Sequence, residues 1–185
     1  FGTGQYLNSD DLSDTSTDSF YAVRDKGNGG VARTDLDERE LVESTTAPED
    51  MEVLLSEEVG NGDVENGWYV DLFAEGERIT LSPQVRGEFI FVNFSIPSDN
   101  PCVAGGSSRI MAFGLDGLTP ERAVFDEYDG EVTSYRKVDG IASQSAFLGD
   151  YRFTPTSLGE VDVEGVDIPD LDDALGRQGW QELLE

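Results

Sequence analysis

Short stretches of alternating apolar and polar residues run through the middle of the chain and are separated by glycine-rich turns. The stretch "GWYVDLF" (67–73) places Trp68, Val70 and Leu72 on one side of an extended chain, because successive side chains of a strand point to opposite faces. The stretch "ERITLSPQV" (77–85) continues this alternation after a short turn. Both patterns predict β-strands that pack one face against a core.

The segment "FIFVNFSI" (89–96) has a different pattern. Ile90, Val92 and Phe94 lie on a wholly apolar face, and the opposite face is half apolar. A strand of this kind is expected to be buried on both sides. Together with Trp68, these three residues are the predicted structural core.

Three further strands and two turns extend the pattern. The strands are expected at 19–25, 109–115 and 122–126. The sequences "KGNGG" (26–30) and "RGE" (86–88) are expected to be hairpin turns, because glycine tolerates positive φ angles. The segments from 67 to 126 thus predict a meander of four or five strands, on the order of one β-propeller blade in length. A sandwich or a barrel would also give serial short strands.

Two regions break this pattern. Residues 34–66 are strongly acidic with scattered apolar pairs, and we expect a loop-rich insertion with one or two edge strands. Residues 158–185 alternate valines with acids and then end in "IPDLDDALGRQGWQELLE". Since this ending is short and contains a glycine, it does not predict a stable helix.

The charge of the chain narrows the range of partners. Twelve basic residues stand against 39 acidic ones, which gives a net charge of −27 over 185 residues. Such a chain repels phosphate backbones and anionic lipids, so nucleic acid is not an expected partner. An acidic surface also keeps a protein soluble in salty surroundings, and this explanation has more weight than divalent cation binding.

The sequence has neither a membrane-spanning segment nor a signal peptide. No window approaches the roughly 18 consecutive apolar residues of a membrane helix, and the start "FGTGQYL" lacks a basic and apolar leader. Because the chain opens without Met, we expect it to be part of a longer polypeptide whose targeting signal lies upstream.

Few residues suggest catalysis. Histidine is absent, which removes Ser-His-Asp and Cys-His systems and most zinc sites. The single cysteine, Cys102, has no neighbouring base and cannot form a disulfide within the chain. The phosphate-binding glycine motifs are also missing. We therefore do not expect an enzyme.

One acidic stretch approaches a metal motif. In "FDEYDGEV", Asp126, Asp129 and Glu131 surround Gly130, and calcium loops of the EF-hand type combine alternating oxygen ligands with a glycine at the bend. A closing acid is missing, because Lys137 follows instead. An acidic hairpin turn explains the same residues, and it is the stronger of the two interpretations.

The order of several motifs resembles one known family. The stretch "FGTGQYLNSDDLSDTSTDSFYAV" (1–23) is similar to the "FGTGKYL…DLSDTSTQSFYGI" stretch of the PilY/PilC family of type IV pilus tip-associated adhesins. Further similarity follows in the same order. It covers 67–72, 76–113 with its "IPSDNPCVAGGSS" loop, 139–147 and "GRQGWQELLE" (176–185).

This resemblance implies a fold. Residues 1–185 would be the C-terminal portion of the family's β-propeller domain, an all-β structure of antiparallel four-stranded blades. The earlier blades and the N-terminal adhesive region would lie outside this sequence. Residues 158–185 would close the domain or form its tail.

The resemblance also implies a function. Family members support pilus assembly, sit at the pilus tip with the minor pilins, oppose retraction, and mediate surface attachment and twitching motility. The protein would lie at the cell surface, associated with the outer membrane or secreted through the periplasm. The surface or host receptor is not indicated by the sequence.

The resemblance also bears on two candidate sites, the acidic stretch "DEYDGE" and Cys102. Some members carry a calcium loop of the form "DxNxDGxxD", and "DEYDGE" resembles a degenerate version of a second Asp-rich loop. Calcium is therefore expected in the full-length protein rather than in this segment. Cys102 lies in the most recognisable loop of the resemblance, so we expect a structural cysteine that pairs, if it pairs, outside the chain.

Two other functions are compatible with a propeller. Quinone-dependent dehydrogenases use the same architecture, but the residues that would contact the cofactor are not found in this sequence. A structural propeller segment, with the binding surface elsewhere in the parent protein, is the other alternative.

Overall fold

The computed structural model describes residues 1–5, 9–27, 29–43, 53–55, 64–98, 105–120, 123–125 and 135–168. In these residues the secondary structure consists of twelve β-strands and two short 3-10 helices, η1 (Ser9–Leu12) and η2 (Arg33–Asp35). The expected all-β fold is confirmed. Within the described part of the chain, no helix is long and apolar enough to cross a membrane.

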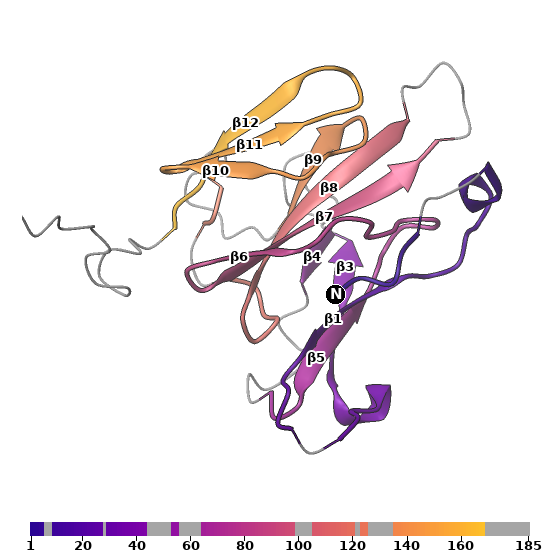
Figure 1. Cartoon of the computed structure of the whole chain (residues 1–185), viewed down its shortest axis with the longest axis vertical. Coiled ribbons are helices and arrows are strands. Elements are labelled where there is room, and N and C mark those ends of the chain that lie inside the picture. Colours follow the sequence, from indigo (N-terminus) through magenta and orange to yellow (C-terminus); the bar gives the residue numbers. More distant parts are fainter. Residues whose placement is uncertain are drawn as a thin grey trace, which may run out of the picture.

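The central sheet is an antiparallel meander of four strands (Figure 1). Its strands, in sheet order, are β6 (Gln84–Arg86), β7 (Phe89–Pro97), β8 (Gly106–Gly114) and β9 (Tyr135–Asp139). The predicted turn at 86–88 is confirmed, since β6 and β7 pair directly across it and Gly87 has a φ of 55°. β7 and β8 pair along their whole length.

A second sheet joins strands that are distant in sequence. Its order is β1 (Ser19–Val23), β5 (Gly67–Asp71) and β2 (Asp37–Arg39), with β2 parallel to β5. The expected hairpin turn at 26–30 is therefore wrong, because the partner of β1 is not the segment that follows it. The expected meander at 67–126 also needs correction, since β5 belongs to this second sheet.

The third sheet lies near the end of the described chain. It contains β10 (Ala146–Leu148), β11 (Tyr151–Pro155) and β12 (Val161–Gly165) in antiparallel order. A separate antiparallel pair is formed by β3 (Leu41–Glu43) and β4 (Val53–Leu55). Parts of the two regions that break the sequence pattern lie outside the described residues. These parts are 44–52 and 56–63 of the region 34–66, and 169–185 of the region 158–185.

Two predicted strands are shorter than expected. In the 77–85 stretch, Arg78 forms an isolated bridge with Ser95, and regular pairing begins only at Gln84. Pro83 lies just before that point and has no N–H group to donate to a sheet ladder. In the described part of the 122–126 stretch, Phe125 forms an isolated bridge with Val166.

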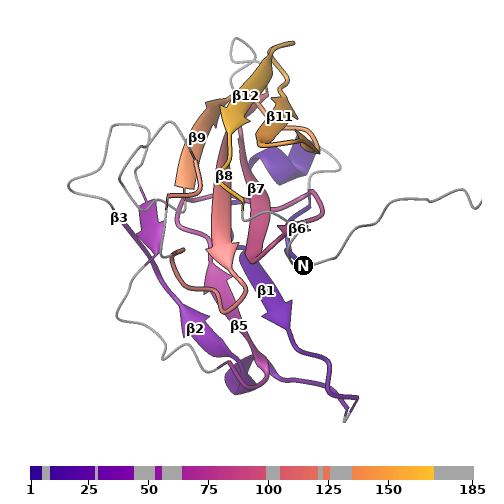
Figure 2. The same cartoon turned by 90° about the vertical axis from the view of Figure 1, so that its left-hand side faces the viewer.

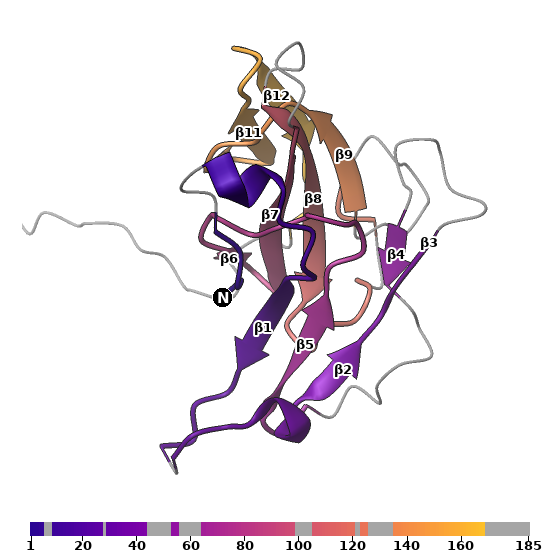
Figure 3. The ribbon, with the colours of Figure 1, turned by 90° about the vertical axis from the view of Figure 1, so that its right-hand side faces the viewer.

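The three sheets form layers, with the β6–β9 sheet in the middle. Figures 2 and 3 show the β1–β5–β2 sheet at one end of β7 and β8, with β11 and β12 at the other. The alternating side chains of β7 contact both layers. Phe94 lies near Phe113, whose ring stacks with Phe20 of β1 at 5.9 Å, whereas Phe91 lies 5.1 Å from the ring of Phe147 in β10.

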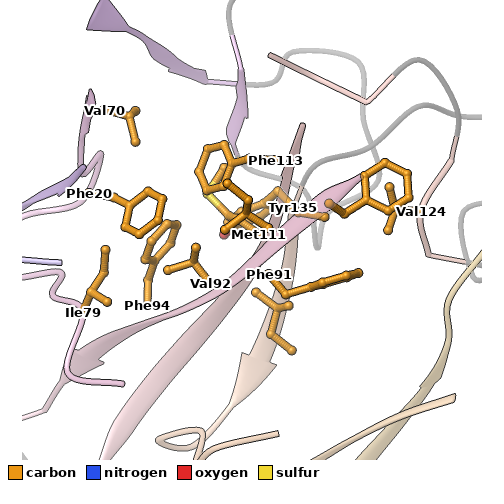
Figure 4. Packing of buried hydrophobic residues seen from close by; sticks show 14 of the residues in the cluster. Phe20, Val70, Ile79, Phe91, Val92, Phe94, Met111, Phe113, Val124 and Tyr135 are labelled. Carbon is orange, nitrogen blue, oxygen red and sulfur yellow. The ribbon is translucent and has the colours of Figure 1, made fainter. Parts of the chain in front are cut away.

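The hydrophobic core follows from this layering (Figure 4). Trp68 and Phe94 are 0% exposed, Val92 is 1% exposed and Ile90 is 8% exposed. The indole Nε1 of Trp68 donates a hydrogen bond of 3.0 Å to the carbonyl of Leu115. This bond satisfies the polar atom of a fully buried side chain, and it ties β5 to the segment after β8.

Candidate functional site

The site residues expected from the sequence lie outside the described residues. This holds for Cys102 and for the loop with Asp126, Asp129 and Glu131. Among the residues that the structure does describe, no group of three or more His, Cys, Asp or Glu side chains could hold a metal ion. The metal loop and the external disulfide therefore stay predictions.

The most distinctive side chains are polar and charged groups that are buried or partly buried between two layers. They project from β7, β9, β11 and β12 into the space between the β6–β9 and β10–β12 sheets. We call them the interlayer polar cluster, which consists of Asn93, Arg136, Arg152, Asp162 and Glu164. Arg152 and Glu164 are direct partners in the β11–β12 register, so they share one face of that sheet.

Arg152 and Glu164 form the centre of the cluster. Nη1 of Arg152 donates to Oε1 of Glu164 at 2.8 Å, and each side chain is only 1% exposed. Nη2 of Arg152 donates a short hydrogen bond to Oδ1 of Asn93 on β7. The ion pair thus connects the third sheet to the central one.

Arg136 on β9 completes the network. Its Nη1 atom donates to Oε2 of Glu164 at 3.1 Å, and its Nη2 atom donates to Oδ1 of Asp162 at 3.0 Å. Two arginines therefore face two carboxylates, and the formal charges balance. Arg136 thus bridges two carboxylates of β12, and such charge-assisted hydrogen bonds are stronger than those between neutral groups.

Burial opposes ionisation at the centre of the cluster. It raises the pKa of Glu164 and lowers the pKa of Arg152, because each charge loses contact with water. The mutual attraction of the pair acts against both shifts. Arg152 also lies over the rings of Phe91 and Phe147, at 5.8 and 5.9 Å from the ring centroids.

Neutral polar groups extend the cluster toward the segment before β10. Nδ2 of Asn93 donates to the carbonyl of Ser143 at 3.1 Å and to Oγ of Ser145 at 3.3 Å. The hydroxyls of Ser145 and Thr154 are 2.9 Å apart. These bonds hold the segment that leads into the third sheet against β7.

A pocket of about 580 Å³ opens beside the cluster. It lies between β9 and β12 and is lined by Arg136, Lys137, Val138, Asp139, Thr156, Glu160, Val161, Asp162 and Val163. Within the described structure, Oδ2 of Asp162 and Oγ1 of Thr156 are buried and make no hydrogen bond.

A second polar group lies on the other side of the molecule. Arg33 of η2 donates to both carboxylate oxygens of Asp71 on β5, each at 2.7 Å. Its guanidinium carbon lies 3.9 Å from the ring centroid of Tyr69. Desolvation by burial acts to raise the pKa of Asp71, but the hydrogen bonds from Arg33 and Ser19 outweigh it and hold this pKa below its ordinary value. These contacts fasten η2 to the second sheet.

Comparison with known proteins gives a consistent result. No family model matches the chain. The type IV pilus biogenesis factor PilY1 homolog of Xylella fastidiosa is 30% identical over 118 residues, which are 60% of this chain and 10% of that protein. The crystal structure of the Pseudomonas aeruginosa PilY1 C-terminal domain matches 90% of this chain with a TM-score of 0.62 and 20% identity.

The resemblance to PilY-type pilus proteins is confirmed. The fold is similar to part of the PilY1 C-terminal domain, since this chain covers 40% of the solved chain. It spans a tenth of the length of the Xylella fastidiosa PilY1 homolog.

The interlayer polar cluster was not predicted from the sequence. Arg136 and Arg152 stand in stretches that were not expected to be strands, and Glu164 lies in a stretch of valines and acids. The alternation in "VDVEG" (161–165) is a recognisable strand signal. It suggests an inward apolar face, whereas the structure turns Glu164 inward and leaves Val161 and Val163 exposed.

Proposed function

We propose that this chain is part of a PilY1-type factor that supports type IV pilus assembly, surface attachment and twitching motility. The observation that carries the proposal is the structural match to the PilY1 C-terminal domain over 90% of the chain. The 30% identity to the Xylella fastidiosa PilY1 homolog over 118 residues supports it independently.

In this proposal the β6–β9 sheet is one blade of a β-propeller. An antiparallel meander of four strands is the repeating unit of that architecture. The stacking of this sheet between two others is also how neighbouring blades pack. The minor pilins and the pilus tip are the proposed partners, at the cell surface.

The chain's own contribution is best explained as a rigid scaffold. The arginines and carboxylates of the interlayer polar cluster pair with one another, so they fix how two sheets dock. This observation favours the alternative in which the chain is a structural segment and the binding surface lies elsewhere in the parent protein. The experiment must therefore distinguish a scaffold from a contact surface.

Genetic replacement in the bacterium that produces the protein tests the proposal. One strain lacks residues 1–185 of the chain, and a second carries alanines at the exposed residues Lys26, Glu65 and Leu115. Pili in the sheared surface fraction, twitching zones and surface attachment are measured, with the amount of the protein followed by immunoblot.

We expect the deletion to abolish surface pili and twitching. If the chain acts as a scaffold, the alanine strain behaves like the wild type, whereas a loss of attachment at normal protein level indicates a contact surface. Normal piliation and twitching in the deletion strain would overturn the proposal.

A further inference from the structure

A pocket of about 500 Å³ lies at one end of the central sheet. It is formed by the residues where β7 begins, by the end of β8 and by the segment that follows β8, and we call it the end pocket. Its lining includes the apolar residues Phe89, Leu115 and Pro120 and the acidic residues Glu88 and Asp116. The end pocket therefore combines an apolar surface with negative charge.

The end pocket is open because a glycine lies opposite Phe89. Phe89 and Gly114 are direct partners in the β7–β8 register, and the side chains of such partners lie about 5 Å apart. Since Gly114 has no side chain, none fills the space beside Phe89 on the neighbouring strand. Phe89 is 2% exposed and Pro120 is also buried, whereas Leu115 is 55% exposed. The pocket thus has a buried apolar base and an exposed apolar side chain at its rim.

The backbone at this rim is held from inside the molecule. Nε1 of Trp68 donates to the carbonyl of Leu115 at 3.0 Å. Nη2 and Nε of Arg39 donate to the carbonyl of Asp116 at 2.9 and 3.2 Å. The Arg39 side chain is 1% exposed, and burying a charge is costly unless hydrogen bonds compensate it. A fully buried arginine therefore helps to fix the position of this short segment.

Hydrogen bonds within the segment fix it further. The N–H of Gly114 donates to the carbonyl of Leu118 at 3.0 Å, and the N–H of Gly117 donates to the carbonyl of Gly114 at 2.9 Å. The N–H of Leu118 donates to Oδ1 of Asp116 at 3.0 Å. Leu115 is thus an exposed apolar side chain on a fixed backbone. A contact surface that is already ordered loses less conformational entropy when it binds.

Charge indicates which kind of partner fits the end pocket. Its charged lining residues in the described structure, Glu88 and Asp116, are both acidic. A second copy of this chain would bring another net charge of −27, and like charges oppose association. A partner that carries a lysine or arginine next to an aliphatic side chain complements both the rim and the base.

We propose that the end pocket binds a peptide segment of another protein, whose aliphatic side chain enters the pocket while a neighbouring lysine or arginine faces Glu88 and Asp116. The volume of the end pocket lies within the range of roughly 300–1,000 Å³ that ligand pockets have. The inference goes beyond the proposed function and does not depend on it. It concerns the binding of a protein segment, not the attachment of the bacterium to a surface.

Saturation-transfer difference NMR with the complete polypeptide tests the inference. The probe with both features is N-acetyl-Leu-Lys-amide. N-acetyl-Leu-Glu-amide has the opposite charge, and N-acetyl-Ser-Lys-amide lacks the aliphatic side chain. Each probe is measured at millimolar concentration with the wild type, Leu115→Ser and Glu88→Gln, after thermal unfolding has shown that the variants are folded. Leu158→Ser is the matched control, because Leu158 is 45% exposed and lies in the turn between β11 and β12.

We expect N-acetyl-Leu-Lys-amide to give the strongest signal, at its leucine methyl groups. The signal of N-acetyl-Leu-Glu-amide is at least about threefold weaker, because the acidic rim repels its charge. Added salt reduces this difference by screening. Leu115→Ser lowers the signal of N-acetyl-Leu-Lys-amide by at least about twofold, since apolar contact is lost, whereas Leu158→Ser leaves it unchanged. Glu88→Gln reduces the preference for the lysine probe over the glutamate probe.

Three results would overturn the inference. Equal signals from the lysine and glutamate probes would show that the rim does not select a basic partner. An unchanged signal in Leu115→Ser would place the binding elsewhere. No signal from any probe would show that the end pocket does not take such a segment, as when another part of the same polypeptide fills it. These results concern peptide binding alone, so they are distinguishable from a failure of the proposed pilus function, which is measured by piliation and twitching.

Discussion

Nη1 of Arg152 lies 2.8 Å from Oε1 of Glu164, and both side chains are withdrawn from water between two β-sheets. Taking two charges out of water is costly, and only good geometry with further hydrogen bonds offsets that cost. Arg136 and Asn93 supply those bonds. The pair therefore makes the docking of the third sheet dependent on a specific set of partners.

Arg152→Met removes the positive partner and leaves the carboxylate of Glu164 buried. We expect the free energy of unfolding to fall by about 3 kcal/mol, at the lower end of the range for broken buried pairs because Arg136 still contacts Glu164. Urea denaturation of the purified protein measures the change.

The matched control for this variant is Lys26→Met. It removes an ion pair with Glu65 in which both side chains are accessible to solvent, and such pairs contribute little to stability. If Lys26→Met shifts the urea midpoint as much as Arg152→Met, the interlayer ion pair has no special role in docking the sheet.

The lowered pKa of Asp71 predicts a loss of stability in acid. Desolvation acts to raise this pKa, but the contacts with Arg33 and Ser19 hold it below the ordinary value of 3.8. The folded state therefore binds a proton less readily than the unfolded state. The ionised carboxylate stabilises the fold above pH 3.8, and this contribution is lost as the pH falls through the lowered pKa.

We expect Asp71→Asn to unfold more easily than the wild type at pH 6 and to approach the wild type as the pH falls below 3.8. Asp25→Asn, in the exposed segment after β1, is the control. Burial raises the pKa of Glu77 and Glu164, which changes the pH dependence in the opposite direction. We therefore compare the urea midpoint of the variant with that of the wild type at each pH. A constant difference across the pH range would contradict the prediction.

The sequence allowed β7 and β8 of the central sheet to be predicted, because both contain long apolar runs and are joined by a nearby connection, whereas β9 was not expected. It did not reveal that β1 pairs with β5. That pairing depends on contacts between distant segments, and alternation does not specify a partner. For β12, the alternation of valines and acids was noted but no strand was predicted, and the inward face is set by Arg152 on the neighbouring strand and by Arg136 across the interface. The interlayer polar cluster could not be predicted for the same reason.

Gly117 limits what the core around Trp68 can accommodate. It has a φ of 79°, and a Cβ atom added there would overlap the indole ring of Trp68. Gly117→Ala therefore combines backbone strain with overpacking, and we expect a loss of about 1–3 kcal/mol. Thermal unfolding measures it. Gly30→Ala is the control, since a Cβ atom at Gly30 meets nothing within 4 Å, and an equal change in both variants would contradict the close approach at Gly117.

The acidic loop with Asp126, Asp129 and Glu131 gives the last prediction, which concerns calcium. The sequence of this stretch has a glycine among its acids but lacks the closing acid that a calcium site of this type uses. We therefore expect Asp129→Asn in the complete polypeptide to leave the calcium-dependent shift in melting temperature unchanged. The measurement compares thermal unfolding in calcium and in a chelator, with Asp25→Asn as the control for loss of one surface charge. A smaller shift in Asp129→Asn alone would mean that this loop binds calcium despite its incomplete pattern, because ligand binding stabilises the folded state by mass action.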